Sequence, residues 1–244
     1  MKSFLKGNKK KGMIKMRFII FQIFMFFSIV SYGQNKHLTI GFKNIGICFG
    51  NSEKNSGLRF NFRDRNVNQI NGINITGVSE SKMANGLTVG LIANYDSIIN
   101  GIVLNGLVGE SYITNGIAVS GLGYVSYKFN GIGIGGLAIA GETLNGLFFS
   151  PIGVTYWNSE KIELINGVTV GIIYGAVAKK LNGVSIGMFE NFTDTTNGVM
   201  IAALNKTEKL YGFQFGILNY AGNNRKLFRW MPIMNFNLRR KPIK

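Results

Sequence analysis

Bulky apolar residues alternate with small ones along most of the chain. In the unit NGLTVGLIANY, Leu87, Val89 and Leu91 are separated by glycine or threonine. The units NGVTVG and NGVSIG, which begin at Asn166 and Asn182, show the same alternation. A period of two is typical of a β-strand whose two faces meet different surroundings. We therefore predict an all-β domain.

The alternating segments are copies of one internal repeat. Asn-Gly pairs recur at steps of 14 to 16 residues, apart from one step of 21 that carries the polar insertion 158–161, and Tyr211-Gly212 continues the phase. Self-similarity at a fixed period is the sequence signature of repeat architectures. The asparagines in phase are Asn71, Asn85, Asn100, Asn115, Asn130, Asn145, Asn166, Asn182 and Asn197.

Short polar clusters such as 95–97 and 193–195 interrupt each repeat and predict turns. If they are the only turns, the chain is an antiparallel β-meander that closes as an outer-membrane-type β-barrel of about 12 strands. Its bulky face meets lipid and its small face lines a narrow interior. Aromatic residues beside the turns, such as Tyr95, Tyr112 and Tyr127, fit the interfacial girdles of such a barrel.

The alternative is a parallel β-solenoid with coils of about 15 residues, in which Asn-Gly is also a turn. Identical residues then stack, so that the asparagines form a ladder, residues such as Leu87 fill the core and residues such as Thr88 face outward. Lipid-facing amides are costly, which favours the solenoid. The segments ENFTDTT and NKTEK are too polar to seal a core, which favours the barrel. We keep the barrel as the main expectation.

The net charge of +16 is concentrated at the two ends of the 244-residue chain. A basic segment, the apolar run 18–30 and small residues before Gln34 predict a signal peptide over residues 1–33. Met13 and Met16 are alternative starts. The remaining chain is expected to form one β-repeat domain over residues 34–238, followed by a basic tail over residues 239–244.

The C-terminal cations predict contact with a negatively charged surface. No acidic residue follows Glu208. Lysine and arginine beside apolar strands favour anionic headgroups, so the expected partner is outer-membrane lipid or lipopolysaccharide rather than nucleic acid, with a surface ligand as a further partner. The residues expected to contact headgroups are Arg225, Lys226, Arg229, Arg239, Arg240 and Lys241.

No set of residues in the sequence predicts catalysis. The chain has one histidine, His37, and one cysteine, Cys48, which are too few for a zinc site of soft ligands. The pattern G-x-G-x-x-G at 131–136 lies inside the repeat, where no helix follows to bind a phosphate. We expect no catalytic, cofactor-binding or metal-binding residues, and Cys48 is expected to be a small buried hydrophobe.

The units NGLTVGLIANY, NGVTVGIIYGA and NGVSIGMFENF, with the ending 230–236, resemble the leptospiral-type surface-repeat family of bacterial envelope proteins. The resemblance covers residues 70–238 and implies a location at the outer membrane or cell surface of a Gram-negative bacterium. It implies no established activity. The expected function is structural, pore-forming or surface-interacting, without catalysis; the alternative is a secreted surface solenoid acting as an adhesin or binding platform.

Overall fold

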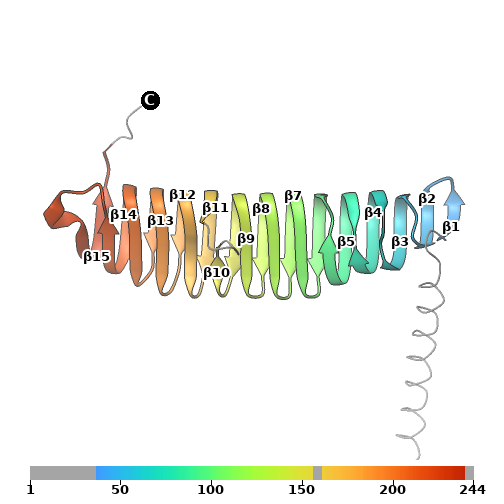
Figure 1. Ribbon diagram of the computed structural model, residues 1–244, viewed down its shortest axis with the longest axis horizontal. Coiled ribbons are helices and arrows are strands. Elements are labelled where there is room, and N and C mark those ends of the chain that lie inside the picture. The colour runs from blue at the N-terminus through green and yellow to red at the C-terminus, as the bar shows by residue number, and fades with distance from the viewer. Residues whose placement is uncertain (1–36, 156–160, 240–244) are drawn as a thin grey trace, which may run out of the picture.

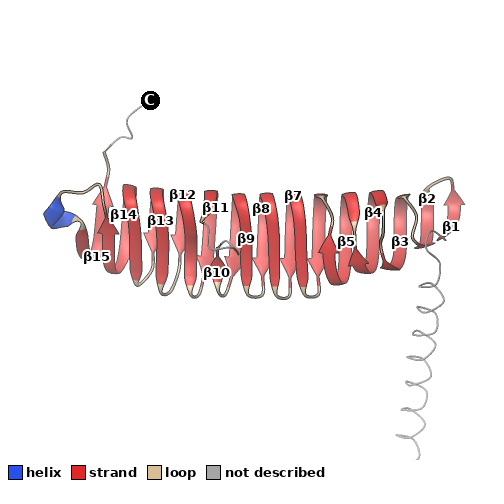
Figure 2. Ribbon diagram, viewed as in Figure 1, coloured by secondary structure: helices blue, strands red, loops and turns tan. Residues whose placement is uncertain are grey.

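Successive repeats pair in parallel, and this pairing builds the whole molecule. The computed structural model describes residues 37–155 and 161–239, which form an elongated β-solenoid of about 11 turns (Figure 1). Strands make up almost all of it, as Figure 2 shows. The elements are β1 (His37–Phe42), β2 (Ile45–Gly50), β3 (Lys54–Arg63), β4 (Val67–Ser79), β5 (Ser81–Tyr95), β6 (Ile98–Asn105), β7 (Val108–Ser120), β8 (Gly123–Gly135), β9 (Ala138–Ser150), β10 (Gly153–Val154), β11 (Ile162–Gly171), β12 (Tyr174–Ile186), β13 (Glu190–Ile201), β14 (Leu204–Ala221), the 3-10 turn η1 (Lys226–Phe228) and β15 (Trp230–Asn237).

The expectation of an antiparallel barrel is wrong, and the alternative of a solenoid is confirmed. Asn100 aligns with Asn115, and Asn115 with Asn130, in parallel register. Antiparallel pairing occurs at the two ends, where β1 pairs with β2 and β14 with β15. The chain coils forward by one strand spacing per repeat instead of reversing, and each ladder Asn-Gly pair lies inside a strand.

The expected asparagine ladder is present. Each side chain from Asn85 to Asn197 in the repeat phase donates an Nδ2–H to the Oδ1 of the preceding asparagine, at 2.6 to 2.8 Å. Stacking thus gives each amide a partner in the neighbouring coil. The repeated amide, which would be costly against lipid in a barrel, is thus accommodated by the solenoid.

The glycine after each ladder asparagine is required by close backbone approach. Gly116 and Gly131 have φ values of +137° and +141°, which side-chain-bearing residues rarely adopt. A Cβ added to Gly116 would collide with the carbonyl oxygen of Gly101 in the preceding coil. The Asn-Gly pair therefore combines a lateral hydrogen bond with a positive-φ backbone conformation that favours glycine.

The small face, not the bulky face, points into the coil. Thr88 is 3% exposed, whereas its neighbours Leu87 and Val89 are half-buried on the outer surface. The expectation that a solenoid would bury Leu87 and expose Thr88 is therefore wrong. Small residues point inward after the ladder asparagine, whereas bulky interior side chains such as Ile99 and Leu144 come from the position before it.

Large and small residues compensate one another between neighbouring coils in the centre of the molecule. Gly133 lies next to the rings of Phe129 and Phe148, and a Cβ there would come within 3.0 Å of both. Gly109 leaves room for the ring of Tyr124. These contacts belong to a buried cluster that contains Ile99, Val103, Ala118, Tyr124, Phe129, Ile139, Leu144, Phe148, Val154, Ile162, Ile165, Ala176, Ala178, Leu181 and Met200.

Polar residues seal the last coils by bonding from coil to coil. Asn191 donates to Asn205 and Asn205 to Asn219, both at 2.9 Å, and the hydroxyl of Thr193 donates to that of Thr207 at 2.9 Å. The asparagines and Thr207 are 0% exposed and Thr193 is 1% exposed. The argument that ENFTDTT and NKTEK are too polar to close a core was wrong, because stacked copies of a polar residue satisfy one another.

Several sequence predictions fall outside the described residues. These are the signal peptide over 1–33, its cleavage before Gln34, and the tail residues from Arg240 onward. Among the residues that the structure describes, no helix is both long enough and apolar enough to cross a membrane. Cys48 is buried as expected, with Sγ 3.4 Å from the Ser52 hydroxyl, and His37 is exposed at the start of β1.

Candidate binding surfaces

One outer face of the solenoid carries apolar side chains in fourteen of the fifteen described strands. We call it the apolar face and define it by two rows, at the second and fourth positions after the ladder asparagine or its equivalent. The rows follow the registers of fourteen strands. The first row is Ile40, Ile47, Leu58, Ile73, Leu87, Ile102, Ile117, Ile132, Leu147, Val168, Val184, Val199, Phe213 and Phe236; the second is Leu38, Phe49, Phe60, Ile75, Val89, Leu104, Val119, Ile134, Phe149, Val170, Ile186, Ile201, Phe215 and Met234.

No residue of these two rows is buried. Leu147 and Phe149 are each 51% exposed, and Ile102 and Ile134 are each 41% exposed. Thirteen steps at a strand spacing of about 4.8 Å make the face about 60 Å long and on the order of 600 Å² in area. A contiguous exposed apolar surface at the top of the range for soluble monomers marks an interaction site.

The loop after each ladder strand extends the apolar face at one edge. Its residues include Leu107, Leu122, Leu137 and Met188, which are between 43% and 62% exposed. Charged residues lie on the opposite arm of each coil, such as Glu110, Glu142 and Lys179. The molecule therefore has one apolar face and one polar face.

A basic groove ends the apolar face at the C-terminal cap. Its volume is about 570 Å³, and Arg225 and Arg239 line it together with Phe228, Met231 and Leu238. Met234 and Phe236, the last members of the apolar rows, also line it. The groove is thus continuous with the apolar face and adds positive charge to it.

Asparagine side chains hold this cap in place. Asn224 donates to the Oδ1 of Asn235 at 2.8 Å and accepts from Asn237 at 2.7 Å, which ties the connection after β14 to β15. The backbone N–H of Arg239 donates to Asn237 Oδ1 at 3.0 Å. The arginine thereby leaves the sheet at a fixed point beside the groove.

The structure brings together two of the residues predicted to contact headgroups. Arg225 and Arg239 share the groove, and Lys226 is exposed on η1. Arg229 is half-buried and donates from Nε to the carbonyl oxygen of Asn224 at 3.3 Å, so it supports the cap. Arg240 and Lys241 lie outside the described residues.

A second groove lies on the polar face and was missed at the level of sequence. Its volume is about 420 Å³, and Tyr95, Tyr112, Tyr127, Glu110 and Glu142 line it. The rings of Tyr112 and Tyr127 stack with centroids 4.8 Å apart. We expected such tyrosines to form membrane girdles, whereas their separation by one repeat length predicts a stack in a solenoid.

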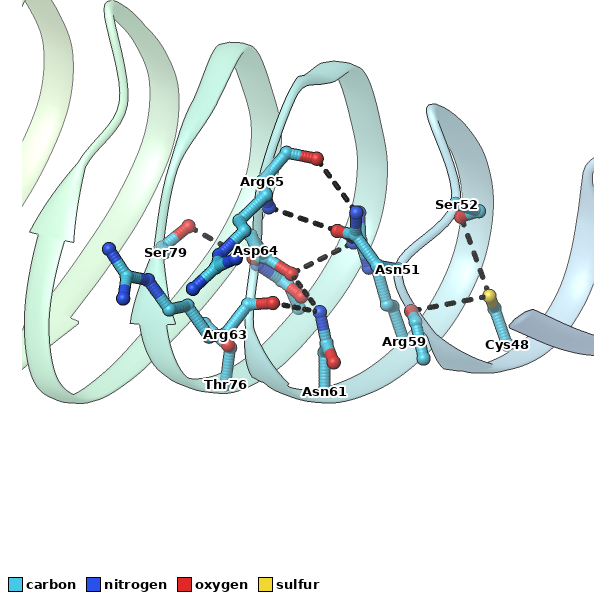
Figure 3. Close-up of polar contacts among 12 residues, drawn as sticks. Cys48, Asn51, Ser52, Arg59, Asn61, Arg63, Asp64, Arg65, Thr76 and Ser79 are labelled. Atoms are coloured by element: carbon cyan, nitrogen blue, oxygen red, sulfur yellow. Dashed lines mark hydrogen bonds and ion pairs between the residues drawn. The ribbon is translucent and has the colours of Figure 1, made fainter. Parts of the chain in front are cut away.

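The interior of the N-terminal coils contains charged groups, which Figure 3 shows in close-up. Arg59 Nη2 lies 2.8 Å from the Oδ1 of Asp64, and both side chains are fully buried. Asn61 and Asn74 donate to the two oxygens of the same carboxylate at 2.8 and 2.9 Å. The pair therefore has hydrogen-bonding partners in several coils.

A second buried carboxyl continues this network. Asp96 is 0% exposed and accepts from the hydroxyl of Ser79 at 3.0 Å and from Asn94 Nδ2 at 2.7 Å. Burial raises the pKa of Asp96 above its ordinary 3.8, although the hydrogen bonds from Asn94 and Ser79 oppose the shift. In residues 37–155 and 161–239, no three His, Cys, Asp or Glu side chains gather closely enough to hold a metal ion.

Comparison of the chain with models of protein families, with curated proteins and with solved structures gives no match. The two exposed grooves and the apolar face are thus the features from which a function is argued. They are surfaces suited to binding.

Proposed function

We propose that the protein is an exported, non-catalytic surface solenoid that lies on the lipid of the outer membrane through its apolar face and serves there as a binding platform. The observation that carries this proposal is the unbroken pair of apolar rows. Fourteen successive strands keep both positions apolar, although no member of either row is buried by the fold. Contacts between neighbouring coils leave many of these side chains half-buried, and an apolar partner would cover the area that stays exposed.

The basic groove gives the protein a preference for anionic lipid. A bilayer interface offers apolar chains beside anionic headgroups. The groove offers the same two chemistries, with Phe236 and Met234 next to Arg225 and Arg239. Each cation near a negatively charged lipid surface contributes about 1 kcal/mol. The phosphates of lipopolysaccharide are the expected partners of these arginines.

The role of a pore is not part of this proposal. In the inward row of the ladder strands, Val103, Ala118 and Phe148 are between 0% and 2% exposed. The described coils are therefore filled by their own side chains. The polar face points away from the bound lipid and remains accessible for a surface ligand, which is the adhesin or platform role.

Vesicle flotation with the purified mature chain tests the proposal. The wild-type chain is expected to float with vesicles that contain anionic phospholipid, and a Leu104→Gln/Ile134→Gln variant is expected to bind about tenfold more weakly, because it removes about 1.4 kcal/mol or more of apolar burial. The matched control is Val125→Gln, an exposed position on the polar face. Equal flotation of the two variants, or wild-type protein that stays in solution, contradicts the proposal.

An Arg225→Ala/Arg239→Ala variant separates the two contributions. It is expected to retain binding to zwitterionic vesicles and to lose its preference for anionic ones, since each arginine adds about 1 kcal/mol at a charged surface. An unchanged preference contradicts the role of the basic groove while leaving that of the apolar face. Export is tested by sequencing the N-terminus of the envelope fraction, which is expected to begin at Gln34.

A further inference from the structure

The groove on the polar face combines three exposed tyrosines with two glutamates in a fixed grid. Two outward rows cross four coils there. The first row contains Tyr95, Glu110 and Val125, which align in parallel register. The second contains Tyr112, Tyr127 and Glu142, one coil after another. These side chains all lie on strands, so the repeat of the coil sets the distances between them.

The carboxylates lie at opposite ends of the tyrosine stack. Glu110 is two residues before Tyr112 on β7, and Glu142 lies one coil beyond Tyr127 on β9. Two strand spacings along the solenoid and two residues across it separate the glutamate backbones by about 12 Å. The stacked rings fill the middle of this diagonal.

The charge of the groove is unusual for this chain. The chain as a whole has 27 lysines and arginines against 11 aspartates and glutamates. None of the ten residues that line the groove is basic, and three of them, Asp96, Glu110 and Glu142, are acidic. Of these, Asp96 points inward, whereas Glu110 is exposed and Glu142 is half-buried at the surface. The groove is therefore a local negative site on a basic protein.

Aromatic rings and carboxylates together recognise organic cations. A cationic nitrogen is attracted to the face of a tyrosine ring, and a methylene chain packs on its apolar surface. Carboxylates form charge-assisted hydrogen bonds with ammonium groups. Tyr95, which is 47% exposed, lies beside Glu110 in the adjacent coil and adds a ring at that end of the groove.

We infer that this groove binds an extended aliphatic polyamine. One terminal ammonium group lies at Glu110 between Tyr95 and Tyr112, the methylene chain crosses the edges of the tyrosine stack, and the second ammonium group lies at Glu142. The inference does not depend on the membrane role of the apolar face, which belongs to the other arm of the coil.

Isothermal titration of the folded mature chain with spermidine tests the inference. Saturable binding with one site is expected. Butylamine, which has a similar methylene chain and a single ammonium group, is expected to bind at least tenfold more weakly because it reaches only one carboxylate. Equal affinity of the two amines contradicts the two-ended site.

Three variants locate the binding. Glu110→Gln and Glu142→Gln are each expected to weaken spermidine binding about tenfold, and Tyr112→Leu about threefold to tenfold, because they remove a charged partner or an aromatic ring. The matched control is Glu208→Gln, an exposed carboxylate near the C-terminal end of the solenoid. Circular dichroism verifies that each variant is folded.

The outcomes of these titrations separate a built site from general charge attraction. Loss of affinity with Glu110→Gln and Glu142→Gln, but not with Glu208→Gln, supports the inference. Equal loss in all three variants shows attraction to scattered carboxylates and overturns it. Absence of saturable spermidine binding to the folded wild-type chain also overturns it, whatever the vesicle experiments show.

Discussion

The first coils and the central coils close around opposite kinds of interior. At the inward position three residues after the ladder asparagine or its equivalent, the first coils carry Arg59 and Asn74, whereas the central coils carry Val103, Ala118 and Phe148. Parallel backbone pairing and the two apolar rows run through both regions. The interior of this solenoid can therefore be polar in one region and apolar in another, provided that the side chains of each coil fit those of the neighbouring coils.

Side chains of neighbouring coils fit together in different ways in the two interiors. In the centre the match is one of volume, since the rings of Phe129 and Phe148 use the space beside Gly133. In the first coils it is one of charge and hydrogen bonding, since Asp64 accepts from Arg59, Asn61 and Asn74. A volume mismatch leaves a cavity, whereas a charge mismatch leaves a buried ion without a partner.

The largest effect is expected from Arg59→Met. The substitution leaves the Asp64 carboxylate buried without its ion-pair partner, which costs about 3–5 kcal/mol. Urea unfolding at neutral pH, followed by circular dichroism, measures the change in the free energy of unfolding.

The double variant Arg59→Met/Asp64→Asn is the control. It removes both charges, so it is expected to recover most of the lost stability. A double variant that is as unstable as Arg59→Met alone means that the packing of the arginine, not its charge, holds these coils together.

A smaller effect is expected from Leu144→Ala in the central interior. Leu144 is fully buried, and removal of its side chain leaves a cavity that costs about 2–4 kcal/mol. Unlike the loss in Arg59→Met, this loss cannot be recovered by removing a partner charge. The same unfolding measurement applies.

Leu147→Ala is the matched control, since it truncates the same residue type three positions later on the apolar face. Leu147 is 51% exposed, and its truncation is expected to cost less than about 1 kcal/mol in detergent-free buffer. Similar losses at the two positions contradict the division of the strand into an inner and an outer face.

The alternation of residues allowed part of this architecture to be predicted. The barrel hypothesis placed the bulky side chains outside and the small ones inside, and Leu87 and Thr88 lie in that way. The solenoid hypothesis provided the asparagine ladder and the stacked repeats. Each hypothesis was right about one property, because a period of two determines which residues share a face but not the direction in which neighbouring strands run.

The rest depends on contacts between repeats. The sequence ENFTDTT reads as a polar turn, yet Asn191 and Thr193 are buried because the next coil places Asn205 and Thr207 beside them. The tyrosine groove depends in the same way on the alignment of Tyr112 with Tyr127. Aligning the repeats with one another, including their polar positions, is the signal that would have found both. Of the predicted headgroup contacts, Arg225 and Arg239 meet only because β15 folds back on β14.

The smallest effect at neutral pH, and the most informative about the polar interior, is expected from Asp96→Asn. Because burial raises the pKa of Asp96, the folded chain binds a proton more readily than the unfolded chain between pH 3.8 and the raised value. The contribution of this group to stability is therefore full below pH 3.8 and is lost as the pH rises through that window. Asparagine carries no charge at any pH, so the variant is expected to gain stability relative to the wild type as the pH rises from 3.8 toward 7. Thermal unfolding of both proteins from pH 3 to pH 8 measures the difference, in which the other titrating groups cancel. If the stabilities of the two proteins change in parallel with pH, Asp96 has the same pKa in the folded and unfolded chains, and the prediction is wrong.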